Sequence, residues 1–368
     1  MSEAITNPVP AAARTEVIDR ADRLRPSPRR GLGLAAATVA ALLVAALLAV
    51  VIGSVAIPPG AVLALVLERL TGLRSAVAYP PAYATILFDI RLPRVTLMAL
   101  TGAALAAAGA SYQGLFRNPL ADPYLVGVAA GAGLGATLAL VFNLPSTFVG
   151  LSAVPISAFV GALLTVGLVV LSARVGGSMP ISTTLLAGVA IGSFASAFTT
   201  FIMLRSPDGL RRSFNWMLGG YAGGGWDPVL IILPYLVVGM AAVQLNARAL
   251  NVLQLDEEQA RQLGINVDRV KLVLVVAATL MTAAVVAFGG LIGFVGLIVP
   301  HSLRLLGGPD YRRLIPLSAI GGAAFLILAD LVARTVVAPQ ELPVGVVTAI
   351  AGAPFFVFLL RRLKRSVF

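Results

Sequence analysis

The stretch Leu253-Gln-Leu-Asp-Glu-Glu-Gln-Ala-Arg-Gln-Leu-Gly-Ile-Asn-Val-Asp268 is a short polar segment in an otherwise mostly apolar chain. Asp256 is placed to cap a helix, and Gln259 follows three residues later, as in a capping box. Gly264 is placed to end that helix, and Asn266 can cap a second one that enters the next apolar run. This polar segment, residues 253–268, is therefore predicted to fold as helix-turn-helix, either as a solvated loop or as a docking surface.

The composition around this segment indicates a polytopic membrane protein. The chain has 368 residues, of which 58% are hydrophobic and 12% charged, whereas soluble domains carry about 25% charged residues. Its apolar runs are long and lack the alternation of an outer-membrane barrel strand, so we expect an all-α helical bundle. The 37 glycines and 23 prolines predict that several helices are kinked or broken.

Ten apolar spans can be placed along the chain. They are residues 34–57, 92–112, 123–143, 147–172, 183–204, 228–247, 271–289, 290–306, 314–336 and 343–360. Residues 1–30, rich in arginine and proline, are expected to be a disordered cytoplasmic tail. Residues 31–368 then form one ten-helix membrane domain, with its polar cytoplasmic helices at about 250–268.

The basic residues are distributed unequally between the two sides of this topology. The side that holds both termini and the polar segment carries 19 of them, and the opposite side carries eight. By the positive-inside rule, both termini and the polar segment are expected in the cytoplasm. The same distribution explains the net charge of +11 without nucleic-acid binding.

Catalytic and cofactor signatures are missing from the sequence. It has no cysteine, one histidine (His301) and two lysines, and no Gly-x-x-x-x-Gly-Lys-[Ser/Thr] loop for ATP. No Ser-His-Asp set, paired carboxylates or metal-ligand cluster is evident. We expect a chain that is not an enzyme and holds no cofactor or metal of its own; His301 is more simply a structural residue than a proton carrier.

Several other stretches combine polar or small residues with apolar spans. Arg91, Arg94 and Arg334 lie at the outer ends of spans, where they form either a docking rim or, for Arg334, an i, i+4 pair with Asp330. Residues 117–123 and 181–184 are either plain connections (the Ser and Thr of the second capping a helix) or constrictions at the inner end of a pathway. The small residues of 102–109 and 127–135 predict close helix packing, with a pore lining as the alternative.

Together these stretches resemble the FecCD permease family, the membrane subunits of ATP-driven bacterial importers for iron-siderophores, haem and cobalamin. The resemblance covers about residues 58–362. The stretches that carry it, in order, are Arg91-Leu-Pro-Arg94, Gln113 to Pro123, Leu185-Leu-Ala-Gly-Val189, Trp216-Met-Leu-Gly-Gly220, the polar segment, Gly293 to His301, Ala329 to Arg334, and Glu341-Leu-Pro-Val-Gly345.

The resemblance implies a type II ABC importer permease of ten helices in the bacterial inner membrane. It implies two permease copies in lipid, two ABC ATPase subunits that bind ATP and Mg, and a substrate-binding protein. The implied ATPase-coupling residues are Leu255, Asp256, Glu257, Glu258, Ala260, Arg261, Leu263 and Gly264. The implied docking residues for the binding protein are Arg91, Arg94 and Arg334, and the implied cytoplasmic gate is Asn118, Leu120, Ile181 and Ser182.

Two other functions are compatible with the composition alone. An ion-gradient-driven secondary transporter would place ionisable residues at the membrane midplane, whereas Asp330, Glu341 and Asp122 are expected near the surfaces. An intramembrane enzyme would need a catalytic set. Among cargoes, an iron-siderophore is expected first, and haem or cobalamin next.

Overall fold

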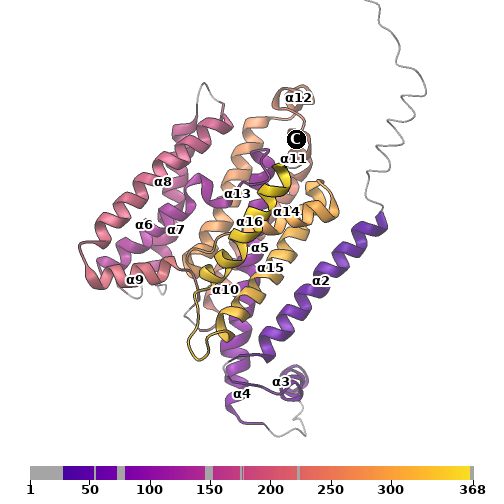
Figure 1. The fold of residues 1–368 in the computed structure, drawn as a ribbon, viewed down its shortest axis with the longest axis vertical. Coiled ribbons are helices and arrows are strands. Elements are labelled where there is room, and N and C mark those ends of the chain that lie inside the picture. Colours follow the sequence, from indigo (N-terminus) through magenta and orange to yellow (C-terminus); the bar gives the residue numbers. More distant parts are fainter. Residues whose placement is uncertain are drawn as a thin grey trace, which may run out of the picture.

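The computed structural model describes residues 28–53, 55–72, 79–145, 152–174, 176, 178–221 and 224–364. In this part of the chain the regular structure is almost wholly helical (Figure 1). Its elements are α2 (Pro28–Val51), α3 (Pro59–Thr71), α4 (Ala82–Thr85), the π-helix η1 (Ile86–Arg91), α5 (Leu92–Leu115), the 3-10 helix η2 (Pro123–Val126), α6 (Val128–Val141), α7 (Ala153–Ala173), α8 (Ile181–Met203), α9 (Pro207–Met217), α10 (Asp227–Leu245), α11 (Ala247–Leu253), α12 (Glu257–Gln262), α13 (Val267–Gly289), α14 (Val295–Gly307), α15 (Tyr311–Thr335) and α16 (Val344–Lys364). The tail predicted for residues 1–30 lies outside the described residues, apart from its last three, with which α2 begins.

Each of the ten predicted spans overlaps at least one helix. Within the described residues, seven helical stretches are long and apolar enough to cross a membrane: α2, the continuous run α4–η1–α5, α7, α8, α10, α13 and α15. The apolar parts of α6, α14 and α16 are shorter. The prediction of an all-helical, multi-pass membrane protein is confirmed.

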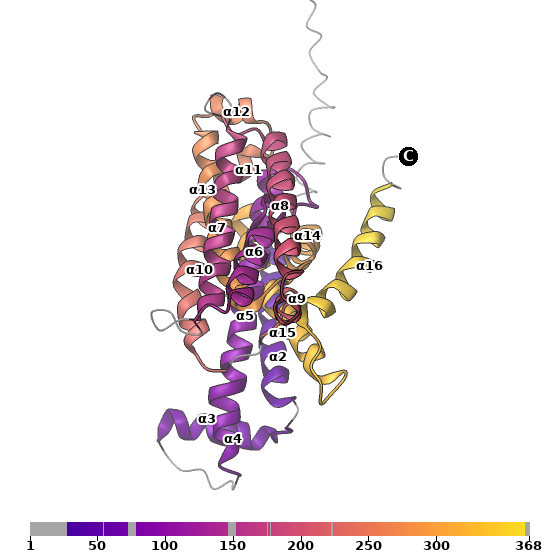
Figure 2. The same cartoon turned by 90° about the vertical axis from the view of Figure 1, so that its left-hand side faces the viewer.

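Three helices form the interior of the bundle. In the most apolar part of α4–η1–α5, α13 and α15, 78%, 72% and 61% of the residues are buried, compared with 22% for α2 and 28% for α8. Figures 1 and 2 show α5 and α15 running through the middle of the molecule, with α8 and α16 at its edges. Helices at the edges expose apolar side chains to lipid or to another chain.

Glycine contacts allow α5 to approach its neighbours closely. A Cβ on Gly102 would overlap the backbone of Gly322 in α15, and a Cβ on Gly109 would overlap the backbone of Gly296 in α14. The close packing predicted for residues 102–109 is therefore confirmed, because only a residue without a side chain fits at these crossings.

The second span starts earlier than predicted. The helix runs without interruption from Ala82 through Pro93, rather than starting at Leu92. Proline has no N–H to donate to the carbonyl four residues before it, which here is that of Asp89. The backbone N–H of Gly225 donates to that carbonyl instead (3.0 Å), and the Trp226 indole donates to the carbonyl of Phe88 (3.0 Å).

Two other spans are broken where continuous helices were predicted. The span predicted at 290–306 begins as a helix only at Val295, because Gly290 and Phe294 have φ angles of 66° and 68°. The span predicted at 123–143 consists of η2 and the 14-residue α6, which is about 21 Å long and shorter than the membrane core. Irregular backbone at this depth has to be buried in protein or line a cavity; here the Tyr124 hydroxyl bonds both the carbonyl and the N–H of Ile292 (3.0 and 3.1 Å).

The packing at Gly109 predicts that Gly109→Ala will destabilise the bundle by about 1–3 kcal/mol, the usual cost of overpacking. Gly167→Ala is the matched control, since Gly167 also lies in a membrane helix but has open space around its Cβ position. Both changes raise helix propensity equally, so thermal unfolding in detergent isolates the packing cost. Equal apparent Tm values for the two variants would contradict the close approach of α5 and α14.

Candidate functional site

The polar segment folds largely as predicted. The Asp256 carboxylate caps α12 by accepting from the backbone N–H of Glu257 (2.8 Å), and Gly264 follows the helix with a φ of 81°. The Asn266 side chain accepts from a backbone N–H in the first turn of α13 (3.0 Å). One detail differs: the Asp256 carboxylate bonds the first amide of α12 rather than the third, that of Gln259, so the expected capping-box geometry is wrong.

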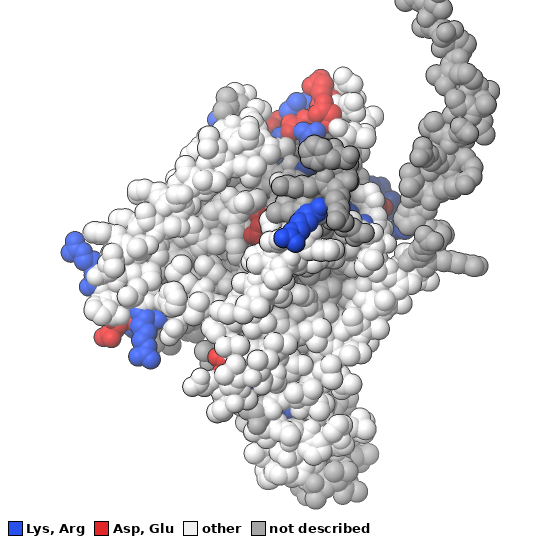
Figure 3. Space-filling model, in the orientation of Figure 1, with Lys and Arg blue, Asp and Glu red and all other residues white. Residues whose placement is uncertain are grey.

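The outer surface of this segment combines apolar and charged side chains. Leu255 and Leu263 are exposed, as are Glu258 and Arg261, whereas Ala260 is fully buried beneath them. Figure 3 shows acidic and basic side chains gathered at this end of a molecule whose visible face is otherwise mainly uncharged, and Figure 1 places α12 there. Exposed leucines bordered by charges are typical of a protein-docking surface.

The ion pairs on this surface are loose. Arg261 lies 3.8 Å from Glu257, 3.8 Å from Glu258 and 3.6 Å from Asp268. Half-exposed pairs at such distances contribute about 1 kcal/mol or less to folding. Arg261 and Glu258 can therefore be changed with little effect on the fold.

The first candidate gate, residues 117–122, is an irregular loop next to the polar segment. The Asn118 side chain accepts from the backbone N–H of Leu120 (2.9 Å), and Asp122 caps η2. Arg117 reaches Asp256, the cap residue of α12, at 3.5 Å. The loop is thus linked to the polar segment by an exposed ion pair.

The second candidate gate lies at the beginning of α8. Pro180 is the residue before the first turn, Ile181 is half-buried and Ser182 is exposed. Pro180 is the N-cap residue and makes no side-chain cap hydrogen bond, so capping by the Ser and Thr of residues 182–184, the plain alternative for this stretch, is wrong. Within the first turn, the Thr184 hydroxyl donates back to the carbonyl of Pro180 (2.8 Å).

Met179, just before Pro180, is held by the first turns of α13. Its N–H donates to the Asp268 carboxylate (3.2 Å), and its carbonyl accepts from the Lys271 ammonium (3.0 Å). Lys271 also pairs with Glu257 of α12 at 2.7 Å. Lys271 is one of the 19 basic residues on the expected cytoplasmic side. Its i, i+3 spacing from Asp268 at the start of an apolar span is the sequence signal of a shared polar face.

A hollow of about 570 Å³ lies between these elements. Its lining includes Arg117, Ile181, Ser182, Glu257, Arg261 and Lys271. Members of the predicted gate and coupling sets thus meet around one space. Asn118 and Leu120 lie in the adjoining loop and do not line it.

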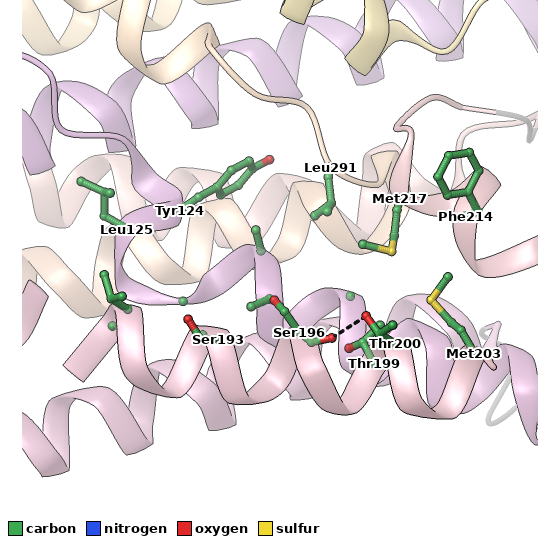
Figure 4. A pocket seen from close by; sticks show the side chains of 17 residues that line it. Tyr124, Leu125, Ser193, Ser196, Thr199, Thr200, Met203, Phe214, Met217 and Leu291 are labelled. Atoms are coloured by element: carbon green, nitrogen blue, oxygen red, sulfur yellow. Dashed lines mark hydrogen bonds between the residues drawn. The ribbon is translucent and has the colours of Figure 1, made fainter. Parts of the chain in front are cut away.

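A second hollow, of about 740 Å³, lies at membrane depth between α6, α8 and α9. Figure 4 shows Ser193, Ser196, Thr199 and Thr200 on one side of it, with Thr200 bonded to the carbonyl of Ser196 (3.0 Å). The described residues that line it carry no charge. Small residues of 127–135 divide between two roles: Gly127 and Gly133 face this space, and others such as Gly131 and Gly135 pack against α7.

The three outer arginines lie in buried contacts within the chain. Arg91 donates to the carbonyls of Val50 (2.7 Å), Val51 (3.0 Å) and Val55, and thereby satisfies the end of α2.

Asp330, 1% exposed, lies between the other two arginines, at 2.9 Å from both Arg94 and Arg334. Arg94 also pairs with the half-exposed Glu341 at 2.9 Å. The Asp330–Arg334 pair expected at i, i+4 is confirmed; the docking role of the three arginines stays a prediction.

This arrangement predicts that Asp330→Asn will cost about 3–5 kcal/mol of stability, because it leaves the buried Arg334 and the partly buried Arg94 without their shared carboxylate. Glu341→Gln removes the same charge from a half-exposed position and should cost less than about 1 kcal/mol. Unfolding of both variants in detergent, followed by intrinsic fluorescence, measures the difference. An Asp330→Asn protein as stable as the wild type would contradict the buried pairing.

Comparison with known proteins agrees with this architecture. The FecCD transport family matches residues 41–362. The cobalamin import system permease BtuC of Halobacterium salinarum is 47% identical over 282 residues, 77% of this chain and 75% of that protein. The hemin transport system permease HmuU of Yersinia pestis is 41% identical over 288 residues, 76% of this chain and 84% of that protein.

A solved structure described as an inward-facing conformation of a metal-chelate type ABC transporter superposes with a TM-score of 0.76 at 28% identity. The match covers 91% of this chain and 99% of that one. With the helical architecture and the family match, these findings show that the chain belongs to the FecCD transport family of ABC transporter permeases.

Proposed function

We propose that this chain is the permease subunit of an importer that uses ATP hydrolysis by partner subunits to move a bulky metal chelate into the bacterial cytoplasm. The single observation that carries the proposal is the contact of the polar segment with both candidate gates. Its exposed leucines offer a docking surface, while Asp256 contacts the 117–122 loop and Asp268 accepts from the N–H of Met179, two residues before α8. Movement imposed on this surface can therefore reach both gates.

The proposed assembly contains a second copy of the permease. On α8, Phe194, Phe198 and Phe201 are exposed and stack in sequence, and much of the α8 surface is uncovered. Figure 2 shows α16 angled away from the other helices, and Ile350 and Phe358 on it are exposed. A homodimer would cover such faces and enclose the apolar hollow between α6, α8 and α9.

The side chains that line that hollow suit a translocation pathway better than a high-affinity binding site. Its hydroxyls and small apolar side chains offer weak, uncharged contacts. A large chelate can then pass without being trapped, since tight binding would slow its release. Alternating access follows if the partner ATPases close on ATP and shift the two gates.

The remaining partners are assigned by the same proposal. ATP and Mg bind to two separate ATPase subunits, and this chain holds no cofactor. A substrate-binding protein docks on the opposite side, where an acidic partner would have to compete with Glu341 for Arg94. The permease lies in the cytoplasmic membrane with both termini and the polar segment in the cytoplasm; the beginning of α2, the end of α16 and α12 lie toward one end of the molecule in Figure 1.

The cargo is proposed as a class. The names of the two relatives above give cobalamin and hemin, and ferric siderophore is the expectation from the sequence. The described lining of the hollow carries no charged side chain that would select among them. All three chelates therefore enter the same experiment.

The direct test uses the permease with its ATPase and binding protein in lipid nanodiscs. ATP hydrolysis is followed while binding protein loaded with ferric siderophore, hemin or cobalamin is titrated. We expect one loaded form to stimulate hydrolysis more than the empty binding protein does, and liposome uptake of that chelate to require ATP. Uptake driven by a proton or sodium gradient, with no stable ATPase complex, would overturn the proposal.

A second test addresses the docking surface itself. Glu258→Ala and Arg261→Ala should leave the unfolding temperature nearly unchanged, because the ion pairs they remove are loose and exposed, but should lower chelate uptake for each ATP hydrolysed. Arg269→Ala, an exposed arginine nearby on α13, is the control for loss of charge. Wild-type uptake and wild-type ATPase stimulation in both variants would remove α12 from the coupling surface.

A further inference from the structure

Lys271 is an unusual residue for its position. It lies in the second turn of an apolar helix, α13, and its side chain is 3% exposed. Removing an ammonium group from water is costly unless partners replace its hydration. Its partners are the Glu257 carboxylate (2.7 Å) and the Met179 carbonyl (3.0 Å), so one buried cation joins α12, α13 and the segment before α8.

Met179 is fixed at both of its backbone polar groups. Asp268, three residues before Lys271 on the same helix, accepts from its N–H at 3.2 Å. Met179 itself is buried. Two side chains at the beginning of α13, Asp268 and Lys271, thus hold the peptide groups on either side of Met179. We call these two residues, together with Glu257, the partner of Lys271 on α12, the Met179 clamp.

The connection from the clamp to the gate is short and stiff. Only Pro180 separates Met179 from Ile181, where α8 begins. Proline fixes its own φ and restricts the residue before it to extended conformations. A displacement of Met179 is therefore passed to Ile181 and Ser182 with little loss through backbone rotation.

The link from the polar segment to the other gate is weaker. Arg117 and Asp256 are 3.5 Å apart, and their side chains are 38% and 50% exposed. Such a pair is largely screened by water, whereas a buried, hydrogen-bonded pair is not. The two gates are therefore unequally attached to the polar segment: the beginning of α8 tightly, the 117–122 loop loosely.

We propose that Lys271 is a positioning residue that transmits the movement of the α11–α12 surface to the beginning of α8 through the Met179 clamp. The inference rests on the function proposed above and specifies how that function is mechanically coupled. Lys271 is buried and lies away from the exposed leucines of the docking surface. Breaking the clamp therefore leaves ATPase docking intact and disconnects the gate.

The test uses the complete importer in nanodiscs and liposomes, with Lys271→Met, Glu257→Gln and the conservative Lys271→Arg. Arg269→Met is the matched control, since it removes a positive charge from an exposed site two residues earlier on α13. In Lys271→Met we expect ATP hydrolysis to persist while chelate uptake per ATP falls about 5- to 150-fold, the range typical of coupling between two sites. Lys271→Arg, which keeps the charge and the donors, should restore most of the uptake, and Arg269→Met should behave as the wild type.

A second readout reports on the gate itself. Because the chain has no cysteine, Ser182→Cys places a single thiol at the beginning of α8. When Lys271 is intact, adding ATP should change the rate at which a water-soluble maleimide modifies this thiol. In Lys271→Met, adding ATP should leave that rate as it is without ATP. A residue with only a structural role would not abolish this response while hydrolysis continues.

Three results would overturn the inference. These are normal uptake per ATP in Lys271→Met, a change of the maleimide rate on adding ATP in that variant as large as with Lys271 intact, or joint loss of hydrolysis and uptake in both Lys271→Met and Glu257→Gln, which would show that the clamp serves assembly. Failure of the proposed function is distinguishable, since the wild-type importer would then show no ATP-dependent uptake at all.

Discussion

The structure depends on one constraint: inside a membrane, each backbone N–H and C=O needs a partner within the protein. Regular helices satisfy this rule by themselves, and three departures from them are matched by specific partners. Pro93 leaves the Asp89 carbonyl free, and Gly225 bonds it. Arg91 satisfies the carbonyls at the end of α2, and the Tyr124 hydroxyl holds the backbone at Ile292, between α13 and α14.

This constraint divides the molecule into a close-packed interior and a less covered edge. Helices α5, α14 and α15 meet at glycines that exclude any side chain, so these helices resist sliding. By contrast, α8 and α16 expose apolar faces, and the hollow next to α8 is lined by small and hydroxyl side chains. An importer needs such an arrangement, because gates move only where packing is incomplete.

Charged residues also differ between the close-packed interior and the exposed surface. The positive-inside rule accounts for the number of arginines on each side but not for their contacts. A largely buried cluster is formed by Arg94, Asp330 and Arg334. Removing one of its members costs far more folding free energy than an ion pair exposed to water contributes, because the remaining charges lose their partner. At the opposite end, exposed Arg261 pairs loosely, while buried Lys271 is tied to Met179. Burial, more than charge, distinguishes the residues that hold the fold from those available to partners.

The sequence by itself determined the helical membrane class, the approximate places of the apolar segments, the caps Asp256 and Asn266, and the small-residue crossings, because these follow from hydropathy and from contacts within a few residues. Only the tertiary structure decided that the helix continues through Pro93, that the span after Gly289 is broken, and that Arg91 caps α2 instead of lying free at the surface. It alone brought Lys271 to Met179, 92 residues away along the chain. Such contacts join groups distant in sequence, and a local pattern carries no information about which buried donor meets which acceptor.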